Sequence, residues 1–216
     1  MEAILENIVR SLKFPRYVDE LVEFRNLEAA ARKRFRETLN EDVREEFING
    51  EVVKQMPAKK RHMDAIGNLC RLIHLFSKLR ELGVVLTEQA LIGLPRNDYG
   101  PDICFWKLDR TTHFDGGTTI FPAPDFICEV LSPSTESRDR GVKFEDYAAH
   151  GVAEYWIVDA DLRVIEQYIA RDGKFELVGK FSEGTIRSRV IEGFEMEILA
   201  AFDEAANLEA MKKMLT

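Results

Sequence analysis

The sequence predicts a mixed α/β fold (α+β in its detail), in which helices flank a restriction-endonuclease-like central mixed sheet. Helical and strand-like patterns alternate along residues 43–200, and such alternation is typical of helices packed on a shared sheet. The length of 216 residues, with 45% hydrophobic and 31% charged residues, suits one globular domain with appendages. We therefore expect a helical extension at 1–42, the sheet domain at 43–200, and a C-terminal helix at 201–216 that packs on it.

The N-terminal extension carries two helical patterns. Apolar residues recur at helical spacing from Ile4 to Leu12 and again from Val18 to Leu27, and Pro15 separates the two stretches. The basic run at 32–36 is more typical of a solvated helix face than of a nucleic-acid contact.

The middle of the chain opens with a hairpin signal. Asn49-Gly50 supplies the positive φ angles of a two-residue turn between strands at 43–48 and 51–53. The helix expected next, at about 59–82, would end at Gly83 as its C-cap. Beyond it we expect three short strands, at 84–86, 90–94 and 102–106. A loop at 107–122 follows them.

The second half repeats the alternation. A short buried strand at 124–131 precedes a helix that Ser134 or Thr135 caps and that ends near His150, with Gly151 just beyond it. Three strands of a meander are expected next, at 154–158, 163–169 and 174–181. A less regular strand pair at 185–198 and a closing helix at 203–215 complete the chain.

Composition excludes several classes of protein. No run of ~18 apolar residues exists to span a membrane, and the first residues lack the basic and apolar regions of a signal peptide. Three widely spaced cysteines indicate reduced core residues in a cytoplasmic protein, and the four histidines lack zinc-site spacing. A net charge of −8 argues against coating nucleic acid by bulk charge, but a nuclease needs only a local basic surface.

Two strands carry carboxylates within apolar runs. On the strand at 124–131, Asp125 and Glu129 share one side of the pleat, whereas Phe126, Cys128 and Val130 take the other. A buried carboxylate needs a cation or hydrogen-bond donors, so a structural ion pair and a functional site are both open for each acid. Asp102 begins a second strand of the same kind.

Asp102 and Glu129 on neighbouring strands would form a hard oxygen site for a divalent cation. Magnesium is commonly held by one or two carboxylates together with waters and phosphate oxygens. A nearby cation would complete such a site, and Lys143, on the helix after the strand, is the candidate. A solvated lysine is the simpler interpretation of that position.

These residues resemble the Uma-type family of putative restriction endonucleases. The similarity lies in Pro101-Asp102, in Pro124-Asp125-(x)3-Glu129-Val130-Leu131-Ser132-Pro133-Ser134-Thr135, and in the segment Gly151-Val152-Ala153-Glu154-Tyr155-Trp156-Ile157-Val158-Asp159. Arg138-Asp139, Lys143 and Tyr147 between them, and Asn49-Gly50-Glu51-Val52-Val53, Pro57 and His62 upstream, fit the same pattern, so the resemblance covers about residues 43–200.

The resemblance places the chain in the PD-(D/E)XK nuclease superfamily. It implies magnesium-dependent hydrolysis of DNA phosphodiester bonds, with manganese as a substitute, and Asp102 and Glu129 as metal ligands. Leu131 stands where the superfamily usually has lysine, and Lys143 would be the migrated lysine. Asp125 and Glu51 would be additional site residues, and dimers in the superfamily allow a homodimer here.

Other interpretations stay open. The nuclease fold serves equally as a catalytically inactive module for binding nucleic acid or protein, which fits the acidic net charge, and other phosphate esters would suit the same ligands. His62 is more typical of a surface or capping residue than of a general base. Tyr147, Tyr155 and Trp156 are more typical of core packing than of base stacking.

Overall fold

The computed structural model describes residues 3–40, 43–87 and 90–215. The chain divides into two compact units, residues 1–54 and residues 55–216, and each has its own organisation. None of the helices in the described ranges combines the length and apolarity needed to cross a bilayer.

The first unit holds two helices and a hairpin, α1 (Ala3–Val9), α2 (Phe14–Glu37), β1 (Glu45–Ile48) and β2 (Glu51–Lys54). Pro15 lies in the first turn of α2, where its missing N–H has no helical partner to lose. Asn49 and Gly50 have φ angles of 51° and 90°, so the turn between β1 and β2 is the predicted one. The break between the two helices and the hairpin are thus both confirmed.

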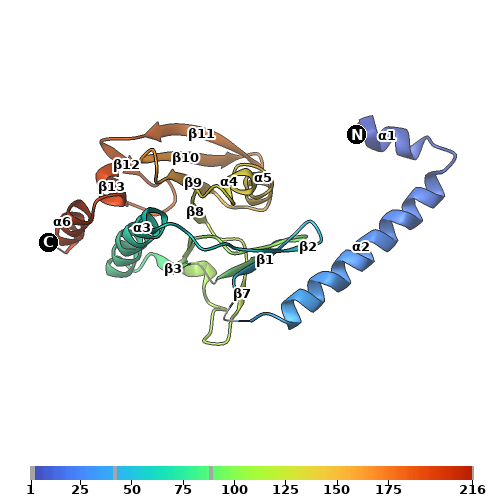
Figure 1. The fold of residues 1–216 in the computed structure, drawn as a ribbon, viewed down its shortest axis with the longest axis horizontal. Coiled ribbons are helices and arrows are strands. Elements are labelled where there is room, and N and C mark those ends of the chain that lie inside the picture. The colour runs from blue at the N-terminus through green and yellow to red at the C-terminus, as the bar shows by residue number, and fades with distance from the viewer. Residues whose placement is uncertain (1–2, 41–42, 88–89, 216) are drawn as a thin grey trace. The chain divides into compact units, whose positions relative to one another are not determined.

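The second unit is built on a six-stranded mixed sheet (Figure 1). Its centre is the parallel pair of β8 and β9, and every other neighbouring pair is antiparallel. The sheet confirms the predicted mixed α/β class. In spatial order the strands are β11 (Lys174–Phe181), β10 (Val164–Arg171), β9 (Glu154–Asp159), β8 (Phe126–Val130), β6 (Ile103–Lys107) and β3 (Gly83–Thr87).

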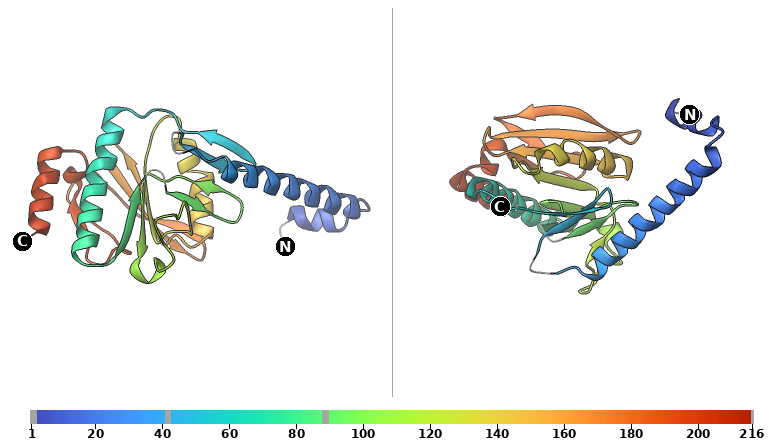
Figure 2. Two further views of the ribbon diagram at one scale, coloured as in Figure 1. Left: turned by 90° about the horizontal axis from the view of Figure 1, so that it is seen from below. Right: turned by 45° about the vertical axis from the view of Figure 1, so that its right-hand side comes forward.

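Helices cover both faces of this sheet. On one face, α3 (Lys60–Leu79) lies beside α6 (Glu204–Met214), as Figures 1 and 2 show, with the 3-10 helix η2 (Ile198–Ala201) next to them. The main core lies between these helices and the inward side chains of the strands, among them Phe105, Phe126 and Trp156. On the other face lie the short helices α4 (Glu136–Asp139) and α5 (Val142–Ala149).

Smaller elements complete this unit. Strand β4 (Leu91–Gly93) pairs with β5 (Asp98–Tyr99) on one side and β7 (Ile120–Phe121) on the other, and β12 (Thr185–Arg187) pairs with β13 (Glu195–Glu197). The 3-10 helix η1 (Leu108–Arg110) and β7 fall within the stretch expected to be a loop. Strand β4 and the β12–β13 pair lie within the strands expected at 90–94 and 185–198, whereas η1, β5 and β7 are too short to show a hydrophobic period.

Two glycines act differently from expectation. Helix α3 ends at Leu79, before Gly83, and Gly83 begins β3 instead. A Cβ atom at Gly83 would lie 1.9 Å from the carbonyl oxygen of Trp106, so close strand packing requires this glycine. Gly141 separates α4 from α5 in the segment expected to be one helix, and a Cβ there would lie 2.6 Å from the carbonyl oxygen of Ser137.

Candidate active site

Glu129 lies on β8, at the centre of the main sheet. The pleat turns Phe126, Cys128 and Val130 into the core beneath α3, as predicted, and leaves Glu129 on the opposite face, under α5. Only 3% of the glutamate is exposed. A carboxylate this deeply buried depends on the donors around it.

Among the described residues, at least three donors contact the Glu129 carboxylate. Lys143 Nζ lies 3.0 Å from Oε1, and the Tyr147 hydroxyl donates to the same oxygen over 3.1 Å. The backbone N–H of Asp102 donates to Oε2 over 3.2 Å. The carboxylate is therefore fixed in orientation by one ammonium, one hydroxyl and one main-chain group.

Asp102 stands immediately before β6 and is linked to the Glu129 strand in return. The backbone N–H of Val130 donates to Asp102 Oδ2 over 2.7 Å. Burial raises the pKa of Asp102 from 3.8 to about 6, although the Val130 N–H, His62 and the Lys143 ammonium act in the lowering direction. A second cation at this carboxylate would relieve the cost of its burial.

Lys143 lies on α5 and is only 2% exposed. Its Nζ is shared between Glu129 and Asp139 Oδ1, the latter at 3.2 Å. The turn at Gly141 between the two short helices brings Asp139 and Lys143 to the same side. Position in the sequence identified Lys143, and the structure places it at the glutamate.

An aromatic cluster holds α5 against the sheet. Phe144, next to Lys143, packs on Tyr155, Tyr168 and Phe175 with ring centroids 4.9 to 6.1 Å apart. Tyr147 packs edge-on against Tyr155 at 5.5 Å. These contacts tie the lysine-bearing helix to β9, β10 and β11.

Asp125 does not join the two acids. Arg110 Nη1 and the backbone N–H of Lys107 each lie 2.9 Å from its carboxylate oxygens. This is the structural ion pair that the sequence left open as an alternative for each acid.

Glu51 is the first residue of β2, in the first unit, and its side chain is exposed. Its part in the site stays a prediction.

Three residues near the site were underrated from the sequence. Tyr147 is buried as expected, yet its hydroxyl contacts Glu129. Asp139 pairs with Lys143, and their i,i+4 spacing in the sequence already indicated such an ion pair. His62, on the first turn of α3, has Nδ1 3.3 Å from the carbonyl oxygen of Leu131, the residue that follows β8. No local pattern reveals that contact.

The oxygen donors suit magnesium. The described residues contain no group of three or more His, Cys, Asp or Glu side chains arranged for a metal, and magnesium needs only one or two carboxylates. Within the same ranges, one oxygen of Asp102 takes a hydrogen bond and the other takes none. Asp102 and Glu129 therefore fit a site completed by water and phosphate oxygens.

Comparisons with known proteins agree with this fold. A search of curated proteins found no match. Among solved structures, a crystal structure described as a putative nuclease belonging to DUF820, from Anabaena variabilis ATCC 29413, superposes with a TM-score of 0.68 and 18% identity. The superposition covers 78% of this chain and 94% of that one, and identity this low supports a shared fold. The family model Uma2, described as "Putative restriction endonuclease", matches residues 22–201, so the match begins within α2. The chain belongs to the Uma2 family.

Proposed function

We propose that the protein is a magnesium-dependent endonuclease that hydrolyses DNA phosphodiester bonds at Asp102, Glu129 and Lys143. The observation that carries the proposal is the reciprocal link between Asp102 and Glu129, with the buried Lys143 ammonium 3.0 Å from Glu129. Two acids that can hold Mg²⁺, with a cation beside them, can activate a water and stabilise the charge that develops on a phosphate during hydrolysis.

Each side chain has a definable task. Asp102 and Glu129 would hold Mg²⁺, which supplies positive charge for the scissile phosphate and lowers the pKa of a bound water. Lys143 would orient the attacking water and stabilise negative charge on the phosphate as it develops. Tyr147 positions Glu129 through the hydrogen bond to Oε1, and Asp139 holds Lys143 in reach.

A basic segment beside the site supports a nucleic-acid substrate despite the net charge of −8. Lys59, Lys60 and Arg61 are exposed at the start of α3, and the adjacent His62 contacts the residue after β8. Lys60 and Arg61 form exposed ion pairs with Asp64 and Asp161. Such exposed pairs contribute little, so phosphate groups can compete for these cations.

Cleavage of supercoiled plasmid DNA with Mg²⁺ or Mn²⁺ tests the proposal. Asp102→Asn, Glu129→Gln and Lys143→Met should each remove cleavage, because each eliminates a ligand or the nearby cation. Asp125→Asn is the matched control, since it changes a buried carboxylate on the same strand segment that contacts Arg110 instead. Cleavage that persists in both acid variants would refute the assignment.

A second readout does not depend on activity. At metal concentrations near 100 times Kd, binding should add ~2.7 kcal/mol to the free energy of unfolding of the parent protein. Glu129→Gln should lose this gain, whereas Asp125→Asn should keep it. Metal-dependent stabilisation without cleavage would favour the inactive binding module.

A further inference from the structure

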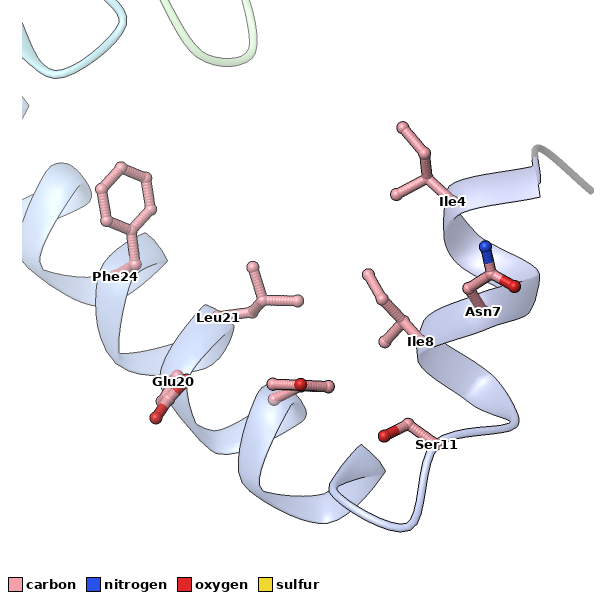
Figure 3. A pocket seen from close by; sticks show the side chains of 8 residues that line it. Ile4, Asn7, Ile8, Ser11, Glu20, Leu21 and Phe24 are labelled. Atoms are coloured by element: carbon pink, nitrogen blue, oxygen red, sulfur yellow. The ribbon is translucent and has the colours of Figure 1, made fainter.

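The proposed function leaves unexplained a pocket in the first unit and a polar cluster in the second. The pocket lies between α1 and α2, where Ile4, Leu21 and Phe24 point into one apolar space of about 660 Å³ (Figure 3). Of the described residues that line it, Glu20 alone is charged, and it pairs with Arg16 at 2.7 Å. The pocket therefore offers a phosphate group no cation, whereas the polar cluster contacts elements of the candidate active site.

The polar cluster is built around Asp146, on α5. Asn97 Nδ2 and the Tyr99 hydroxyl both donate to Asp146 Oδ2, each over 2.7 Å, and Asn97 also donates to the Tyr99 hydroxyl over 2.8 Å. His150 Nδ1 lies 2.8 Å from the other oxygen, Oδ1. We call these four residues the Asp146 cluster. Asn97 and Tyr99 are buried and the Asp146 side chain is 13% exposed, so the hydrogen bonds at Oδ2 are largely shielded from water and strengthen one another.

The Asp146 cluster joins two segments of the candidate active site. Tyr99 is the last residue of β5 and precedes Asp102 by three residues. Asp146 follows Lys143 by three residues on α5, so the two side chains are neighbours on the helix surface. The cluster therefore ties the segment that leads into Asp102 to the helix that carries Lys143.

The ring of Tyr99 makes a second contact with α5. It packs edge-on against Tyr147 with ring centroids 5.2 Å apart, and the Tyr147 hydroxyl contacts Glu129. Burial and the Asp146 carboxylate raise the pKa of the Tyr99 hydroxyl, with Lys143 acting in the lowering direction. The hydroxyl therefore keeps its proton at neutral pH and remains a donor to Asp146.

Lys143 needs a hold that does not depend on Glu129. Its ammonium pairs with Glu129 at 3.0 Å and with Asp139 at 3.2 Å. When Glu129 also serves a divalent cation, its carboxylate attracts the ammonium less, and two cations at one carboxylate repel each other. The hydrogen bonds to Asp146 Oδ2 involve neither Glu129 nor the ammonium, so this competition does not weaken them.

We propose that Asn97, Tyr99 and Asp146 are positioning residues that hold Lys143 beside the two acids while Mg²⁺ is bound. They act through α5 and touch neither the metal nor the phosphate. The proposal rests on the proposed function, because it gives these residues a task in the same reaction.

Hydrogen exchange of the α5 amides, with and without Mg²⁺, tests the hold directly. Tyr99→Phe removes the hydroxyl and keeps the ring that packs on Tyr147. In the parent, α5 should exchange equally in both conditions. In Tyr99→Phe it should exchange roughly tenfold faster with Mg²⁺, because a hydrogen bond to a charged acceptor contributes enough to account for that factor. Ser188→Ala is the matched control, since it removes another hydroxyl that donates to a buried carboxylate, over 2.6 Å to Glu154, and it should leave α5 exchange equal in both conditions.

Plasmid cleavage supplies the second readout. Tyr99→Phe should lower kcat about 10- to 100-fold and leave KM within about twofold, because a displaced ammonium weakens the transition state rather than substrate binding. Asp146→Asn should have a similar effect, and the double variant should be little worse than either, since both changes disrupt one unit. Ser188→Ala should keep the parental kcat.

The outcomes separate the positioning role from the proposed function. Parental kcat in Tyr99→Phe, or α5 exchange that does not respond to Mg²⁺ in this variant, would overturn the positioning role. The proposed function would still stand if the parent cleaves DNA and Lys143→Met does not. A parent chain without cleavage would instead refute the proposed function, and α5 exchange would then decide whether the Asp146 cluster holds the helix.

Discussion

Replacing Asp102 by asparagine should stabilise the protein at alkaline pH. Burial raises the pKa of Asp102 from 3.8 to about 6, so the folded state disfavours the ionised form. The contribution of Asp102 to the free energy of unfolding is fully present below about pH 4 and is lost as the pH rises through about 6. A rise of this size corresponds to roughly 3 kcal/mol. The Val130 N–H can still donate to the amide oxygen of asparagine, so the local link survives.

The assay is urea unfolding of the parent and Asp102→Asn at pH 4, 6 and 8. We expect equal free energies of unfolding near pH 4 and an excess of up to roughly 3 kcal/mol for the variant at pH 8. Asp125→Asn serves as the control and should have the opposite sign at pH 8, because it breaks the contact with Arg110. An Asp102→Asn variant less stable than the parent at pH 8 would refute the argument that burial dominates.

Three further outcomes follow from buried polar groups. Lys143→Met should cost about 3 to 5 kcal/mol at pH 7 in thermal unfolding, because it leaves the buried Glu129 without its ammonium partner; a neutral effect would mean that the pair carries no net energy. Glu154→Gln should cost at least about 2 kcal/mol in urea unfolding, since this buried carboxylate accepts five hydrogen bonds; an unchanged midpoint would contradict it. Burial acts to raise the pKa of Glu166, but hydrogen bonds, first from Arg140, lower it to about 2. Its stabilisation of about 2 kcal/mol, after screening of its exposed partners, should be present above pH 4.5 and lost as the pH falls toward 2. Glu166→Gln should abolish that part of the pH profile, and an unaltered acid limb would exclude it.

The fold was largely predictable because its main elements carry strong local signals. The hairpin at Asn49-Gly50, the long stripe of α3 and the alternation along β8 each follow from one stretch of sequence. The short elements β5 and β7 are fixed by tertiary pairing, which a local period does not reveal. Gly83 shows the same limit, since the contact that demands it comes from Trp106 on another strand.

The candidate site was predictable in part. Asp102 and Glu129 were identifiable in the sequence because carboxylates are rare within apolar strands. The sequence could not distinguish the paired Asp125 from them, since Arg110 reaches it from a separate segment. Lys143 was identifiable only by its distance along the chain from the strand. The turn at Gly141 that aims it needs a glycine because a Cβ there would lie 2.6 Å from the carbonyl oxygen of Ser137, and the sequence does not show that close approach.

The aromatic packing around α5 has a consequence for residues far from Asp102 and Glu129. Phe175, on the outer strand β11, contacts Phe144 with ring centroids 5.1 Å apart, and Phe144 is the direct neighbour of Lys143. The position of the ammonium is therefore set partly at the margin of the sheet. If the proposed assignment holds, relatives with identical acids and lysine would differ in turnover through ring substitutions at this margin. Transplanting the three residues onto another scaffold would then not transfer the activity unless these rings came with them.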